Sequence, residues 1–213
     1  MPTTTVDSIV SNAAEVLQDT AHARWAASEL IEWLNEAQRV IANYADDADI
    51  RRENVTTVAV TKQDVSSLTS FARIVDVVRV VSTDRALVRG EKALLDSLRP
   101  QWRAEAQSAD AEMWMYDDRE PNIFEVYPPI SASESIEVVY SAIPNTASSG
   151  GNITISDKYT PAILDYVLYR AFLKDTEDVA SDMGRAAAHL GAFANLMGIK
   201  QKADIVVRPK DQT

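Results

Sequence analysis

The sequence predicts an α+β protein in which the N- and C-terminal helices form a helical bundle with an inserted antiparallel β-sheet domain. Three observations predict this fold. Apolar residues recur at helical spacing up to residue 44 and again from about residue 161 to residue 197. Between these regions, runs rich in Val and Thr are typical of strands. Short polar turns between neighbouring strands favour antiparallel pairing.

Four segments are expected along the 213 residues, a length that allows one medium domain or two small ones. Residues 1–48 are predicted to form an N-terminal helix pair, and residues 49–145 an antiparallel β domain. Residues 146–199 are predicted to form a C-terminal helix pair that packs with the N-terminal helices, and residues 200–213 an extended docking tail.

Two helices are expected before residue 45. Thr5 is placed to cap the first helix. Its apolar positions follow helical spacing: Val6, Ile9, Val10, Ala13 and Leu17. After a break at residues 19–23, Ser28 is placed to cap a second helix, Glu29–Tyr44. The apolar stripe of that helix consists of Leu30, Trp33, Leu34, Ala37 and Ile41. The short break favours an antiparallel helix pair.

The central region is predicted to contain five strands and one short helix, about Glu91–Leu98, that ends before Pro100. The strands are expected at Asn54–Thr61, Phe71–Val81, Glu112–Tyr116, Ile123–Tyr127 and Ser135–Ser141. Residues 117–122 form a polar turn between the third and fourth of them.

Helices resume after a linker, Pro144–Asn152, whose Gly150-Gly151 pair indicates a hinge or a surface loop. Thr160 is placed to cap the helix Pro161–Lys174, which is apolar nearly all round and therefore expected to be covered on several sides. The last helix, about Asp178–Met197, is expected to end at Gly198. Four of its residues are small enough for another helix to approach closely: Gly184, Ala187, Ala188 and Gly191.

Composition excludes several classes of function. The net charge is −11 and no cluster of Lys and Arg is present, so nonspecific DNA binding is not expected. There are no cysteines, which excludes disulfides and zinc–thiolate sites. No stretch approaches the roughly 18 apolar residues of a membrane span, and the N-terminus does not read as a signal peptide.

No catalytic constellation is recognisable, and we expect no catalytic, cofactor-binding or metal-binding residues. The two histidines, His22 and His189, lie in no ligand or triad pattern. The acidic group at residues 46–49 could hold a divalent cation, but a solvated helix end is the preferred interpretation. The acidic group at residues 117–120 could act as paired catalytic carboxylates, but a solvated turn or a subunit contact is the preferred interpretation. A small metal-dependent enzyme using residues 117–120, or a regulatory binding module, remains the alternative.

The tail combines an apolar, strand-like triplet with a basic turn: Ile205, Val206, Val207, Arg208, Pro209 and Lys210. An apolar triplet in a terminal tail has to pack on something. The two interpretations are docking on a partner protein and packing on its own domain.

One long segment resembles a known signature. Residues 24–39 read RWAASELIEWLNEAQR, which is similar to the N-terminal motif of bacteriophage head-to-tail adaptor (connector) proteins: an R-W pair before a helix of the type E-L-x-x-W-L-N-x-x-Q-R. Asp46-Asp47-Ala48 stands where the family has P-D-A, with Asp in place of Pro. Further landmarks follow in the family's order: Leu95-Asp96 with Pro100-Gln101-Trp102, Tyr116–Pro121, Phe124–Pro129, Tyr140–Pro144 and Asp165–Phe172.

The resemblance implies a structural protein of the virion neck, not an enzyme, like the tail tubular adaptor of short-tailed phages. Such proteins usually assemble as twelve copies into a ring in the host cytoplasm. One face of the ring docks on the portal protein, and the other receives the tail nozzle or tail tube protein. DNA passes through the channel without specific binding, and no cofactor or membrane is involved.

Two segments are candidate contact sites within such a ring. The tail residues 205–210 are expected to dock on the portal, since an extended segment can add a strand to a partner's sheet edge. The turn residues Asp117, Asp118, Arg119 and Glu120 are expected to contact a neighbouring subunit or the tail component.

Overall fold

The structure, a computed structural model, describes residues 2–174 and 179–198. It confirms the predicted α+β class. The backbone divides into two compact units. One, which we call the helical unit, comprises Met1–Asp49 and Pro144–Thr213; the other, the β unit, comprises Ile50–Ile143.

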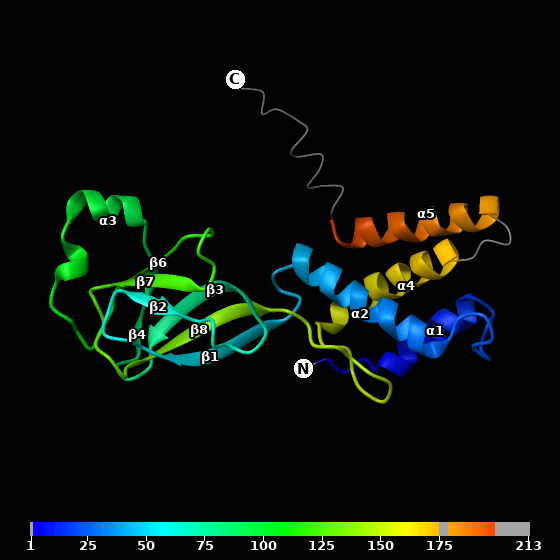
Figure 1. Cartoon of the computed structure of the whole chain (residues 1–213), viewed down its shortest axis with the longest axis horizontal. Coiled ribbons are helices and arrows are strands. Elements are labelled where there is room, and N and C mark those ends of the chain that lie inside the picture. The colour runs from blue at the N-terminus through cyan, green and yellow to red at the C-terminus, as the bar shows by residue number, and fades with distance from the viewer. Residues whose placement is uncertain (1, 175–178, 199–213) are drawn as a thin grey trace, which may run out of the picture. The chain divides into compact units, whose positions relative to one another are not determined.

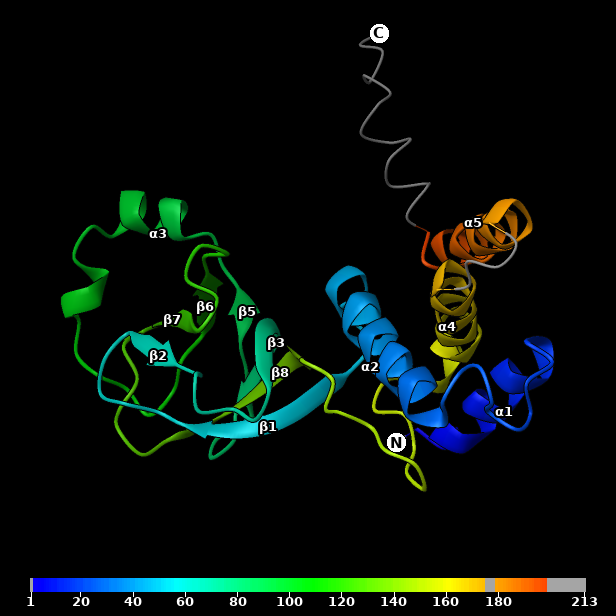
Figure 2. The same ribbon diagram turned by 45° about the vertical axis from the view of Figure 1, so that its right-hand side comes forward.

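The helical unit is organised around α4. Its described elements are α1 (Val6–Val16), α2 (Ala27–Tyr44), the short 3₁₀ helix η2 (Asp157–Tyr159), α4 (Thr160–Lys174) and α5 (Val179–Leu196). Helix α4 packs against α1, α2 and α5, and α1 also packs against α2 (Figures 1 and 2). This position explains why α4 is apolar nearly all round, since three helices cover it.

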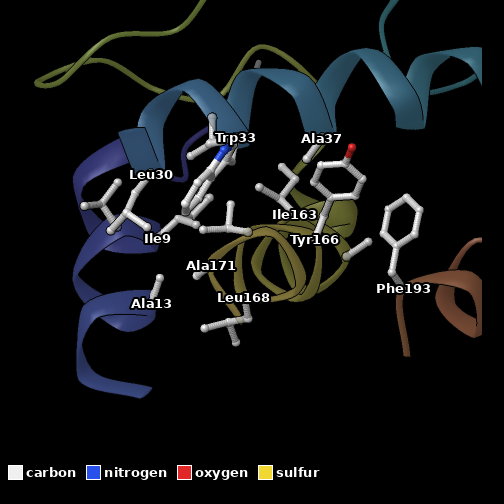
Figure 3. Close-up of a cluster of buried hydrophobic side chains, with 14 of the residues drawn as sticks. Ile9, Ala13, Leu30, Trp33, Ala37, Ile163, Tyr166, Leu168, Ala171 and Phe193 are labelled. Atoms are coloured by element: carbon white, nitrogen blue, oxygen red, sulfur yellow. The ribbon is translucent and has the colours of Figure 1, made fainter. Parts of the chain in front are cut away.

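The core of the helical unit lies between these helices. Figure 3 shows side chains from all four helices meeting around α4: Ile9, Ala13, Leu30, Trp33, Ala37, Ile163, Tyr166, Leu168, Ala171 and Phe193. Each large aliphatic or aromatic side chain buried in this way contributes about 1.5–3 kcal/mol to folding. Tyr166 and Phe193 meet edge to face with ring centroids 5.3 Å apart, which joins α5 to α4.

The predicted cap of α1 is confirmed, whereas that of α2 is wrong. The Thr5 hydroxyl accepts a hydrogen bond from the Ser8 N–H at 3.2 Å. Helix α2, in contrast, begins at Ala27 after an uncapped Ala26, so Ser28 lies inside its first turn. The loop before α2 is instead ordered by the Asp19 carboxylate, which accepts backbone N–H groups from residues 23–25. These bonds hold the pKa of Asp19 below its ordinary value, and the bond from the Trp25 N–H has the largest effect.

At the other pair of helices, the expected cap of α4 is wrong and the expected stop of α5 is confirmed. Thr160 is not a cap, because η2 runs directly into α4 and Thr160 already has helical dihedral angles, φ −51° and ψ −45°. Gly198 adopts a left-handed φ of +63° after α5, and its N–H donates to the Asn195 carbonyl at 3.1 Å. This is the conformation in which glycine ends helices.

The β unit contains two four-stranded sheets. The first has the order β1 (Ile50–Thr56), β8 (Ser135–Ala142), β3 (Phe71–Val80), β4 (Arg85–Ala86). The second has the order β2 (Lys62–Asp64), β7 (Ile123–Tyr127), β6 (Met113–Tyr116), β5 (Val88–Arg89). All neighbouring strands are antiparallel except β5 and β6, which are parallel. Side chains from both sheets form one core, which includes Val77, Trp114, Phe124, Ile136 and Tyr140.

The expectation that sequence neighbours pair holds for β6 and β7 but fails for β7 and β8. Strand β7 ends at Tyr127, directly before Pro128-Pro129, because proline has no N–H to continue a ladder. The chain then crosses to the other sheet, where β8 is the central strand between β1 and β3. Burial of every residue from Ile136 to Ala142 follows from that position. The strand expected at Asn54–Thr61 begins earlier, at Ile50, and ends at Thr56.

An excursion between β5 and β6 carries α3 (Lys92–Leu98) and the 3₁₀ helix η1 (Trp102–Ala104). It packs on the second sheet through a separate apolar cluster formed by Leu95, Trp102, Met115 and Tyr127. The predicted short helix is therefore confirmed, and its buried side is Leu95 alone.

Candidate functional site

A buried polar clasp in α2 holds the chain segment that follows the β unit. The Asn35 side chain donates to the Ala147 carbonyl at 2.9 Å and accepts from the Ala147 N–H at 2.8 Å. Gln38, which is fully buried, donates to the Asn35 side-chain oxygen and accepts from the Thr154 N–H at 2.6 Å. The two side chains thus replace water for backbone groups that have no helix or sheet partner.

This clasp changes the interpretation of the segment expected to be a linker. Ala147, Ile153 and Ile155 are buried in the helical core, so both ends of residues 147–155 are fixed there. Between them the segment forms an exposed tip, in which Ser148, Ser149, Gly150 and Asn152 are exposed and Gly150 adopts a φ of +78°. Even this tip is tied to α1, because the Gly151 carbonyl accepts the Val6 N–H at 2.9 Å.

The predicted contact turn lies in the exposed β6–β7 hairpin. The Asp117 carboxylate accepts three hydrogen bonds from Arg119, each 3.0 Å long, which hold the pKa of Asp117 below its ordinary value. Glu120 faces Lys62 at 3.4 Å, and both side chains are more than half exposed. The hollow beside Asp117 and Glu120 measures about 10 Å³, about the space of one water molecule. The turn therefore has the geometry of an exposed, charged surface loop and offers no substrate pocket.

The acidic group near residue 47 serves a structural purpose. The Asp47 carboxylate is hydrogen-bonded by the Lys158 ammonium and, at 2.6 Å, by the Tyr159 hydroxyl. These bonds lower the pKa of Asp47, and the bond from Lys158 has the largest effect. Asp47 thereby joins the end of α2 to η2. In residues 2–174 and 179–198, no three acidic or histidine side chains gather in a way that could hold a metal ion.

His189 on α5 packs between two neighbours. Its Nδ1 lies 2.8 Å from a carboxylate oxygen of Asp165, and its ring stacks on Phe172 with centroids 5.7 Å apart. A cavity of about 520 Å³ adjoins it, with Arg24, Trp25 and Arg185 in its lining. The sequence did not indicate this cavity, since its lining comes from distant parts of the chain.

Two acids buried in the β unit were also missed. Glu125 on β7 lies 3.0 Å from Lys92 and 3.4 Å from Arg103, which fastens the α3–η1 excursion to the sheet. Glu137 on β8 pairs with Arg79 at 2.6 Å and Arg52 at 2.7 Å, and so joins all three long strands of the first sheet. These arginines, Arg79 most strongly, lower the pKa of Glu137. A single Glu flanked by apolar residues in a strand is the sequence signal for both.

The tail residues 205–210 lie outside the described residues. Among the helices that the structure describes, none is both long and apolar enough to cross a membrane.

Comparison with known proteins gives one family. No curated protein sequence matches the chain significantly. The family model described as SU10 adaptor protein matches residues 4–211, nearly the whole chain and both units. This match agrees with the ordered landmarks from residue 24 to residue 172. The chain therefore belongs to the SU10 adaptor protein family, a family of phage head-to-tail adaptors with a structural role in the virion.

Proposed function

We propose that this adaptor forms a twelve-membered ring that joins the portal protein to the tail nozzle or tail tube and surrounds the DNA channel. The observation that carries the proposal is the family match over residues 4–211. The ring assembles in the host cytoplasm, where the portal acts as its template. Alone, the chain is a monomer or a small oligomer, because each contact between subunits is only part of the total contact.

The helical unit is suited to act as one rigid bundle in that ring. Helix α4 is enclosed by three helices, and the Asn35–Gln38 clasp fixes the returning chain to the same body. Rigid elements hold interaction surfaces in place at low entropic cost. In the β unit, the salt bridges of Glu125 and Glu137 likewise hold neighbouring elements rigidly together.

The acidic character of the chain supports passage of DNA through the ring. With a net charge of −11, a lumen lined by this protein offers phosphates few counter-charges. DNA is then repelled from the wall and slides, which is the behaviour required of a channel between the head and the tail.

The turn 117–120 contacts a neighbouring subunit or the tail component in this proposal. Its support is exposure: the Arg119 side chain is 89% exposed, and the turn stands at the tip of a two-stranded hairpin. Exposed charged loops contribute to the specificity and rate of docking more than to affinity.

The tail residues Ile205, Val206, Val207, Arg208, Pro209 and Lys210 dock on the portal in this proposal. Val and Ile favour added strands at a sheet edge, and Arg208 and Lys210 would steer the tail to an acidic surface. Pro209 limits further strand growth.

Truncation tests the docking tail. Deletion of residues 203–213 should leave the thermal transition almost unchanged and sharply reduce co-migration with the portal protein in size-exclusion chromatography. Deletion of residues 211–213 is the matched control, because it keeps the apolar triplet and the basic turn. A strongly lowered melting temperature with portal binding retained would show that the tail packs on its own domain.

A further inference from the structure

Helix α5 presents an apolar face that no other part of the described chain covers. We call it the α5 outer face; it consists of Met183, Gly184, Ala187, Leu190, Gly191 and Ala194. Spacings of three, four and seven place these residues on one side of the helix. Met183 is 60% exposed and Leu190 is 41% exposed. The side that meets α4 carries the buried Ala186 and Phe193 instead.

Charge distinguishes this face from the rest of the molecule. The chain has 32 Asp and Glu residues against 21 Lys and Arg residues, yet the α5 outer face carries none of either kind. Two copies of a protein with a net charge of −11 repel each other at most orientations. An uncharged apolar face is where close approach meets the least repulsion and requires no desolvation of charges.

The backbone of α5 is also open to close approach. A Cβ atom added at Gly184 or Gly191 would meet no atom within 4 Å. Glycine in a helix interior is less favourable than alanine, so these two residues weaken the free helix without a packing benefit inside the chain. A second helix lying over them could approach to the short end of the usual range of helix–helix distances.

We propose that the α5 outer face packs against the helical unit of a second copy of this chain in the assembled ring. This inference rests on the proposed function and adds to it the surface through which neighbouring subunits meet. A closed ring requires a contact in which one face meets a different face of the next copy. In this proposal the α5 outer face is one half of that contact, and the receiving half is a different surface of the neighbouring copy.

Portal filling tests the proposal. Wild-type protein mixed with the portal at limiting ratio should fill it cooperatively, so that mass photometry shows empty and full portals with few intermediates. Leu190→Glu should keep the wild-type circular dichroism spectrum, because the residue is exposed. It should raise the concentration for half-filling at least 10-fold and give partly filled portals. The apolar control Leu190→Met should behave as wild type.

The outcomes separate this inference from the function on which it rests. If wild-type protein never binds the portal, the proposed function fails. If wild-type protein fills the portal and Leu190→Glu fills it equally well, the function stands and the α5 interface is wrong. If Leu190→Glu binds nowhere even in large excess, the α5 outer face meets the portal instead of a second copy, and the inference is equally overturned.

A cross-linking experiment identifies the occupant directly. The chain has no cysteine, so Ala187→Cys carries the only thiol, at an exposed position of the α5 outer face. A thiol-attached photo-crosslinker is activated in portal-bound rings made from a mixture of light and nitrogen-15-labelled chains. Mixed-isotope peptides from two helical units are the expected product. Cross-links to the portal, or to residues 199–213 of the same chain, would contradict the proposal.

Discussion

The Asn35 clasp gives the most quantitative prediction for the helical unit. Replacing Asn35 by Leu keeps the approximate volume but removes both bonds to Ala147, whose N–H and carbonyl are buried. The bond to the Ile31 carbonyl matters less, since that group lies inside α2 and has its helical partner. The change leaves three buried groups without a partner, namely the two backbone groups of Ala147 and the Gln38 side-chain N–H that donates to Asn35. Each costs about 1–3 kcal/mol, and burial of the leucine side chain offsets about 2 kcal/mol. The expected net loss is about 1–7 kcal/mol.

Urea unfolding followed by far-ultraviolet circular dichroism measures this loss, since the helices lie in the helical unit apart from the short α3. Asn12→Leu is the matched control, because Asn12 is exposed on α1 and surface changes usually stay within about 0.5 kcal/mol. A loss for Asn35→Leu no larger than that of Asn12→Leu would refute the reasoning, because the clasp would then not hold the returning chain.

The remaining predictions concern charge. Backbone N–H groups of residues 4 and 3 lower the pKa of Asp157, so its stabilising effect is present above its ordinary pKa and is lost as the pH falls below about 4. The difference in melting temperature between wild type and Asp157→Asn should therefore shrink in acid. A difference that stays constant as the pH falls would contradict this stabilising role of the Asp157 carboxylate. Glu137→Gln should lower the melting temperature of the β unit more than Asp84→Asn does, because Glu137 is buried between two arginines and Asp84 is 76% exposed. Alanine at positions 117, 118 and 120 should preserve folding, checked by circular dichroism, and weaken ring assembly; loss of folding would show that these carboxylates support the domain itself.

Much of the fold follows from local patterns. The helices and the strands β3, β6, β7 and β8 appear within a few residues of their expected positions, because each has the periodicity of its class. Strands β2, β4 and β5 have two or three residues each, too few for any periodicity. The beginning of β1 was missed because Arg51, Arg52 and Glu53 interrupt the apolar alternation at a sheet edge.

The pairing of strands that are distant in the sequence was harder to predict. The separation of the strands into two sheets depends on where β8 pairs after the Pro128-Pro129 break, and no local signal names that partner. The caps expected at Ser28 and Thr160 failed because neighbouring structure took over: Asp19 orders one loop, and η2 leads directly into the other helix. Polar residues within apolar stripes, such as Asn35 and Gln38, were the overlooked signal for the clasp.

The family assignment rests on the match over residues 4–211, with which the ordered landmarks agree, and the structure gives several of these landmarks a physical purpose. The Trp25 indole N–H donates to the Ala171 carbonyl at 3.2 Å, which ties the R-W pair to α4. The N and Q of the helix motif are Asn35 and Gln38. Within the last motif, Arg170 and Tyr166 both bond the Glu36 carboxylate of α2, at 2.6 and 2.9 Å. These residues hold the helical unit together, which is what a structural protein requires.

The central claim, that this adaptor joins the portal as a ring of identical subunits, is tested most directly by particle mass. Mass photometry of the purified 23.5 kDa chain, alone and mixed with the portal protein of the same phage, reports the number of bound copies. The account predicts a monomer or small oligomer alone and a single heavier species with twelve copies on each portal. Portals that stay at their own mass at every adaptor concentration would contradict it.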